Sequence, residues 1–75
     1  MIQSITAALT TIVGIEIGAN IHFEGTSAER TAQVLGDTLE YDNNDYPHLT
    51  LSYNNFDFRC AKLVKAGYKI AILTI

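Results

Sequence analysis

The stretch that decides the fold is NNFDFRCAKLVKAGYKIAILTI, residues 54–75, which joins a helical pattern to an apolar strand pattern. In its first half, apolar residues recur three and four positions apart and predict one buried helical stripe: Phe56, Cys60, Leu63 and Val64. Asn54 or Asn55 can cap this helix, because their side-chain oxygens accept hydrogen bonds from free amides of the first turn. The pattern therefore predicts a helix that ends near Ala66.

A strand follows the helix. Gly67 interrupts the helical spacing, and YKIAILTI (residues 68–75) then gives a run of mostly apolar, partly β-branched residues. Apart from Lys69, this run is apolar at both odd and even positions. Strands buried on both faces have such a pattern, so we expect it to lie in the centre of a sheet.

The N-terminal third contributes further strands. TTIVGIEIG (residues 10–18) is β-branched and mostly apolar. In ANIHFEG (residues 19–25), Ile21 and Phe23 alternate with Asn20, His22 and Glu24 and predict one buried and one polar face. This segment either continues the first strand or pairs with it as a hairpin. The preceding SITAAL (residues 4–9) fits a short helix or the start of the first strand equally well.

The middle of the chain predicts a helix and two strands. In TSAERTAQVLG (residues 26–36), Thr26 and Glu29 have the spacing of a capping box, and Gly36 stands at the expected C-terminal stop. Residues 39–41 and 48–53 read as strands joined by the turn-forming DNND (residues 42–45), with Pro47 ahead of the second strand. The fold class is therefore α/β (α+β): a small mixed β-sheet flanked by two helices.

Length and composition limit the functional classes. The 75 residues fit a single domain, residues 1–75, with 48% apolar and 17% charged residues and a net charge of −3. This balance argues against a broad phosphate-binding surface. The lone thiol, Cys60, allows no intramolecular disulfide and favours a cytoplasmic location. The N-terminal MIQSITAALTTIVG has no basic residue and is too short to span a bilayer, so we predict no signal peptide and no membrane anchor.

No residue set predicts catalysis, a metal site or a cofactor. His22 and His48 have no ligand spacing, so we interpret them as separate surface or strand histidines. Cys60 could pair with a histidine as a nucleophile, but its place on the apolar stripe favours a buried, inert thiol. Four aromatic residues could stack on bases, although half-buried packing in the sheet and turns is the more common role: Tyr41, Tyr46, Tyr53 and Phe56.

Two segments resemble the N-terminal mismatch-recognition domain of MutS-type DNA mismatch-repair proteins. They are GTSAERTAQVLGDTL (residues 25–39) and LTLSYNNFDFRCAKLVKAGYKIAIL (residues 49–73), and AKLVKAGYKIAI (residues 61–72) carries the closest likeness. The resemblance covers residues 11–74 and implies a mixed sheet with flanking helices. It also implies a link to DNA mismatch recognition. The connector, lever, clamp and ATPase domains of full-length relatives do not occur in this sequence, so we expect no ATP-driven repair from it.

The resemblance also indicates which residues replace the family's DNA-reading motif, G-D-F-Y-E. In that motif the Phe wedges beside a mismatched base and the Glu bonds to it. An ungapped match places Asn20 at the Phe and His22 at the Glu. A gapped register that uses Phe23 and Glu24 would break the Phe-x-Glu spacing. The match therefore implies that the base-reading pair has been lost.

We derive two functional hypotheses. The first is a non-enzymatic interaction module that binds a protein partner or forms a homo-oligomer, as an accessory protein of a phage or mobile element, with a contact face at Asn20, His22 and Glu24. The second is a nucleic-acid-binding protein that contacts phosphates through its C-terminal cluster of basic residues: Arg59, Lys62, Lys65 and Lys69. Neither hypothesis involves a membrane, a metal or a small-molecule substrate.

Overall fold

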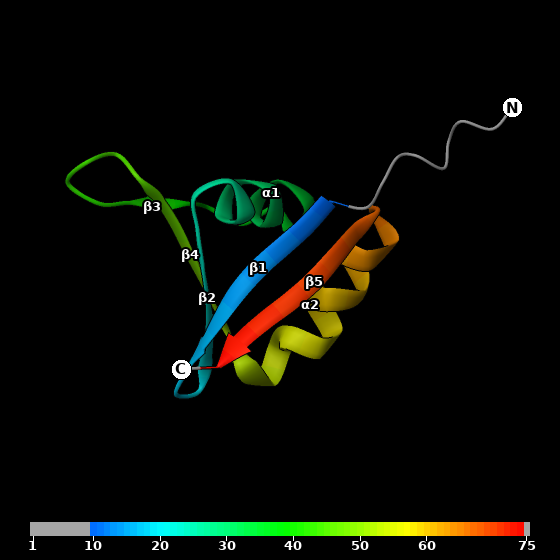
Figure 1. Cartoon of the computed structure of the whole chain (residues 1–75). Helices are drawn as coiled ribbons and strands as arrows, with labels where there is room; N and C mark the ends of the chain where they lie inside the picture. Colours follow the sequence, from blue (N-terminus) through cyan, green and yellow to red (C-terminus); the bar gives the residue numbers. More distant parts are fainter. Residues whose placement is uncertain (1–9, 75) are drawn as a thin grey trace, which may run out of the picture.

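The computed structural model describes residues 10–74, which form a mixed five-stranded sheet with two helices (Figure 1). The elements are β1 (Thr10–Ile17), β2 (Asn20–Glu24), α1 (Gly25–Leu35), β3 (Glu40–Tyr41), β4 (Pro47–Ser52), α2 (Tyr53–Lys65) and β5 (Tyr68–Thr74). The strand order is β3-β4-β2-β1-β5. The β1–β5 pair is parallel and the other three pairs are antiparallel. The predicted fold class is thus confirmed, and residues 19–25 prove to be a hairpin partner of the first strand. The SITAAL segment lies outside the described residues.

Both helices pack on one face of the sheet. Alternate strand residues point into this side and join apolar side chains of α1 and α2 in the core: Ile12, Ile21, Phe23, Leu49 and Leu51 from the strands, and Ala28, Ala32, Phe56 and Leu63 from the helices. Ile21 and Phe23 are fully buried, as the alternation predicted. The residues between them on the strands therefore point to the opposite side of the sheet.

We call this opposite side the open face, because no helix of the described residues 10–74 covers it. It divides into two halves. Its polar half lies on β2 and β4 and consists of His22, Glu24, His48 and Thr50. Its apolar half lies on β1 and β5 and consists of Val13, Ile15, Ile17, Ala71 and Leu73. The register joins the halves, since Ile15 stands between His22 on β2 and Leu73 on β5.

The predicted central position of the C-terminal strand is wrong. Within the described part of the chain, β5 pairs with β1 alone and lies at an edge of the sheet. Its two-sided apolar pattern has a different cause. Ile70 and Ile72 pack against the core, whereas Leu73 belongs to the open face and is 54% exposed.

The helix ends also differ from the prediction. Ser52, not Asn54 or Asn55, caps α2, and its hydroxyl accepts a hydrogen bond from the Asn54 amide. At α1 the N-cap is Glu24 with no side-chain hydrogen bond, so no capping box forms. Gly36 does adopt the left-handed conformation expected of a C-terminal stop, with φ of 75°.

The helices of residues 10–74 are all too short or too polar to cross a membrane.

Candidate functional site

Strand pairing builds the polar half of the open face. β2 and β4 are antiparallel with His22 opposite Thr50 and Glu24 opposite His48. All four residues therefore point to the same side, and two histidines 26 positions apart in the sequence become neighbours. Both histidines lie on strands, as the sequence indicated, but local spacing did not reveal that they contact each other.

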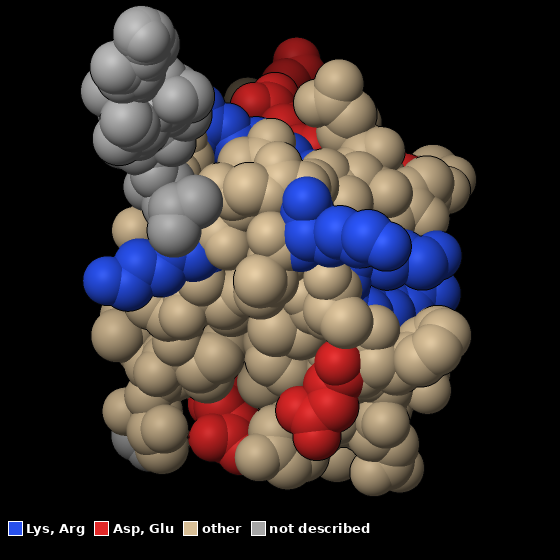
Figure 2. Space-filling view, turned by 90° about the vertical axis from the view of Figure 1, so that its right-hand side faces the viewer, with Lys and Arg blue, Asp and Glu red and all other residues tan. Residues whose placement is uncertain are grey.

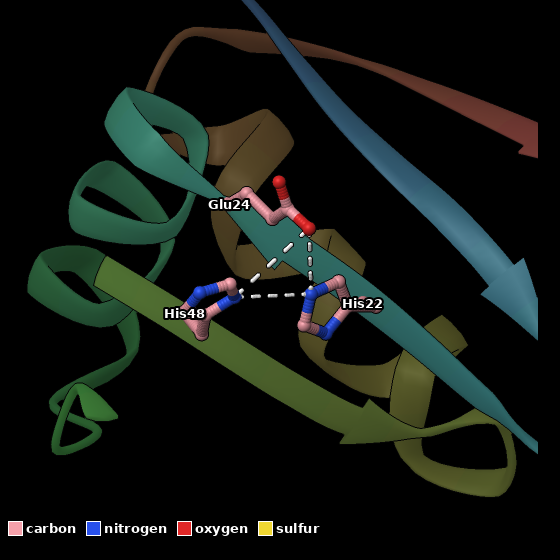
Figure 3. Close-up of side chains that lie close together, drawn as sticks. All are labelled: His22, Glu24 and His48. Carbon is pink, nitrogen blue, oxygen red and sulfur yellow. Dashed lines mark hydrogen bonds and ion pairs between the residues drawn. The ribbon is translucent and has the colours of Figure 1, made fainter. Parts of the chain in front are cut away.

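Three potential ligand atoms converge in this cluster (Figure 3). The Nε2 atom of His22 lies 3.1 Å from Oε2 of Glu24 and 3.2 Å from Nδ1 of His48. The remaining distance, between His48 Nδ1 and Glu24 Oε2, is 4.0 Å. The side chains of His22 and His48 are 22% and 25% exposed, so solvent ions can reach the cluster.

The remaining nitrogen of each histidine has its own partner. Nδ1 of His22 hydrogen-bonds to the Thr50 hydroxyl at 3.0 Å, and Nε2 of His48 hydrogen-bonds to the Asp42 carboxylate at 3.3 Å. These contacts fix the orientation of both rings. They also leave His22 Nε2 and His48 Nδ1 pointing toward Glu24.

Asp42 is itself held by the predicted turn between β3 and β4. Its carboxylate accepts hydrogen bonds from the amides of Tyr46 and Asn44. These two bonds, followed by the bond from His48, lower the pKa of Asp42 below its usual value. The turn also contains Asp45 in the left-handed region, as expected for its Asn- and Asp-rich sequence.

Asn20 is separated from this cluster. It is the first residue of β2, directly after the Gly18–Ala19 turn, and it pairs with Ile17 of β1 and Ser52 of β4. Asn20 is exposed, whereas His22 is partly buried and hydrogen-bonded. Of the three residues in the predicted contact face, the structure therefore brings together His22 and Glu24, with Asn20 at the far end of the strand.

The four basic residues of the C-terminal cluster come from two elements, α2 and β5. Arg59 pairs with Asp37 in the loop after α1, beside a surface pocket of about 390 Å³. Lys62 and Lys65 lie in the last turn of α2, and Lys69 lies on β5. Figure 2, which shows the side that carries α2, has basic side chains in separate groups with uncharged atoms between them.

A comparison with protein-family models identifies this fold. The model described as MutS domain I matches residues 5–74. The chain belongs to the MutS domain I family. A search of curated proteins found no match. The resemblance inferred from the sequence is thus confirmed over nearly the whole chain.

Asn20, which the ungapped match places at the family's aromatic wedge, lies next to the β1–β2 turn and is exposed. His22, which the same match places at the family's Glu, faces Glu24 and His48. Sequence reasoning set His48 aside and missed Asp42. The β2–β4 register brings His48 to His22, and the turn between β3 and β4 brings Asp42 to His48.

The aromatic residues take different places in the domain. Phe56 is buried in the core, which confirms packing for this ring. Tyr41, Tyr46 and Tyr53 are 47–59% exposed, and Phe58, which sequence reasoning did not single out, is 75% exposed. Tyr46 contacts the ring of His48 edge-on, which agrees with the half-buried turn packing that we considered more common.

Cys60 is partly buried on α2 and lies on the helix-covered side of the sheet, away from His22 and His48. Burial, and then the negative charge of Asp57, raise the pKa of its thiol. Because the thiolate is the reactive form, we expect iodoacetamide to alkylate Cys60 several-fold more slowly at pH 8 than in the urea-unfolded chain. The rate should still be rising with pH above the usual titration range of a free thiol. Equal rates in the folded and unfolded chains would contradict this and reopen a nucleophilic role.

Proposed function

We propose that this member of the MutS domain I family is a non-enzymatic interaction module that binds another protein surface through the open face. The observation that supports it is the apolar half of that face. Val13, Ile17 and Leu73 are 39%, 51% and 54% exposed on the paired strands β1 and β5, where Leu73 stands opposite Ile15. Contiguous exposed apolar residues on a small domain are typical of interaction sites.

The edge position of β5 adds to this proposal. Its outer side presents backbone amides and carbonyls that no strand of residues 10–74 pairs with. A second strand can pair with such an edge while side chains of the partner cover the apolar half. The partner is then either another protein or a second copy of the chain, and an interaction module of this kind fits an accessory protein of a phage or mobile element. The single thiol, Cys60, agrees with a reducing compartment such as the cytoplasm.

Asn20 and His22 support a role other than mismatch reading. An amide cannot replace the base stacking that an aromatic wedge provides, and a partly buried histidine is not a carboxylate acceptor. We therefore infer that the base-reading pair is absent from this chain.

Sedimentation velocity with Leu73→Lys tests the protein-binding proposal. We expect the wild-type chain to self-associate at micromolar concentration and Leu73→Lys to remain monomeric, because a buried lysine without a partner opposes association. The matched control is Val64→Lys, whose parent side chain is 56% exposed but lies on α2. The control should associate like the wild type.

If the wild-type chain is monomeric, the partner is a different protein. Affinity capture from the native host, followed by mass spectrometry, should then recover one protein with the wild type and with Val64→Lys but not with Leu73→Lys. A partner retained by all three chains would contradict the role of the apolar half.

Family membership favours nucleic-acid binding as the second candidate function. In that case Lys62, Lys65 and Lys69 would contact phosphates, while Arg59 would first have to leave Asp37. A gel-shift titration with matched, mismatched and single-stranded DNA at low and moderate salt separates the two functions. Tight binding that weakens steeply with salt would favour this candidate, and no binding at micromolar protein would favour the first.

A further inference from the structure

The polar half of the open face has the geometry of a metal site. We propose that His22, Glu24 and His48 bind a divalent transition-metal ion, with zinc as the best-matched ion. The ligand atoms are Nε2 of His22, Nδ1 of His48 and Oε2 of Glu24, which converge in Figure 3. The proposal concerns binding and does not depend on the function of the apolar half.

The three distances agree with the size of a zinc ion. Ligand atoms bonded to a tetrahedral zinc ion at about 2.0–2.1 Å lie about 3.3 Å from one another. In the cluster these separations are 3.1, 3.2 and 4.0 Å. The point equidistant from all three atoms lies about 2.0 Å from each, which is the Zn–N bond length. An ion therefore fits with only small side-chain shifts.

The orienting contacts are also those of a metal site. Metal-bound histidines commonly donate their second N–H to a carboxylate or another oxygen, which fixes the tautomer. Here Asp42 accepts from Nε2 of His48, and Thr50 is placed to accept from Nδ1 of His22. Asp42 thereby leaves Nδ1 of His48 unprotonated and available to the ion. Nε2 of His22 donates to the Glu24 carboxylate, so zinc binding displaces this proton and Thr50 then accepts from Nδ1.

Glu24 is available for this role because it does not cap the helix. It occupies the N-cap position of α1, yet its side chain makes no capping hydrogen bond and turns toward the histidines. Two nitrogens and one carboxylate oxygen suit zinc or cobalt better than magnesium, which prefers oxygen ligands. Three protein ligands leave one position for water or for a group from a bound partner.

Isothermal titration of the full chain with Zn²⁺ in metal-free buffer tests the site. We expect one ion per chain with micromolar or tighter affinity, and no heat from Mg²⁺ at the same concentrations. His48→Gln and Glu24→Gln should each weaken Zn²⁺ binding by at least about 100-fold, because each removes a ligand. Asp42→Asn should weaken it by about 10- to 100-fold, the usual effect of removing an orienting partner. Glu29→Gln, which removes an exposed carboxylate of α1, is the matched control and should bind like the wild type.

Nitrogen NMR of the two imidazoles provides a second readout. Zn²⁺ should shift Nε2 in His22 but Nδ1 in His48, since the other nitrogens are held by Thr50 and Asp42. This pattern differs from that of random binding to surface histidines. Saturation only at millimolar Zn²⁺, unchanged binding by His48→Gln and Glu24→Gln, or metal at the opposite nitrogens would overturn the proposal. Circular dichroism of each variant checks that it remains folded.

Discussion

Gly14→Val should strongly destabilise the protein, although valine is among the best strand-forming residues. Gly14 lies on β1 and faces the core. A Cβ atom at this position would lie 2.8 Å from Cγ2 of Ile21, 2.8 Å from Cε1 of Phe23 and 3.1 Å from Cδ1 of Ile72. Ile21 and Phe23 are fully buried, so neither side chain has space to move away. The two methyl groups of valine would extend further into the same contacts.

Gly14→Val is destabilising because of steric overlap in the core and not because of the backbone conformation at this position. Gly14 does not have the positive φ that favours glycine, so strand propensity alone would make valine stabilising. Overpacking of a core costs about 1–3 kcal/mol and sometimes more. We expect about 3 kcal/mol here, out of a total of about 4–11 kcal/mol for a domain of this size. Thermal unfolding should show a melting temperature lower by about 12–24 °C.

Thr11→Val is the control for this prediction. Thr11 lies on the same strand, is exposed and points to the open face. The substitution places the same side chain on β1 without entering the core, so its melting temperature should stay within a few degrees of the wild type. If Gly14→Val is as stable as Thr11→Val, the core around Phe23 is packed less tightly than in this structure, and the prediction is wrong.

The elements with local patterns could be predicted from the sequence. The alternation around Ile21 and Phe23 predicted a strand with one buried face, and the DNND turn and Gly36 predicted where elements end. Each of these features depends on residues within a few positions of one another. The family likeness of residues 61–72 extended this reading to the arrangement of the sheet, and the match to MutS domain I confirmed it.

Features that depend on pairing between distant segments could not be predicted. The edge position of β5 follows from the strand order. A strand sequence that is apolar at both odd and even positions does not reveal this order. The contact between His22 and His48 requires the β2–β4 register across 26 residues. The cap of α2 depends on where β4 ends. Ser52 is the last residue of that strand, so the helix begins at Tyr53, one residue before Asn54. Tertiary pairing therefore determines the site, while local pattern determines the elements.

Leu63→Ala should cause the second large loss of stability, and the reason lies in the orientation of α2. Leu63 is fully buried, and it and Phe56 are the two buried residues that α2 contributes to the core. Removing a buried leucine side chain leaves a cavity and costs about 2–5 kcal/mol. For a domain of 75 residues this corresponds to a melting temperature lower by roughly 8–40 °C. Chemical denaturation of the purified chain, followed by circular dichroism, gives the free energy directly.

The adjacent Val64→Ala provides a control within one turn of the same helix. The sequence placed Leu63 and Val64 in a single apolar stripe, but the structure leaves Val64 56% exposed. Alanine is a better helix former than valine by a few tenths of a kcal/mol, so Val64→Ala should be neutral or slightly stabilising. Equal losses for the two substitutions would mean that α2 is rotated about its axis relative to this structure. Such a rotation would also turn Arg59 away from Asp37, so the two melting curves test the helix orientation on which the surface charges depend.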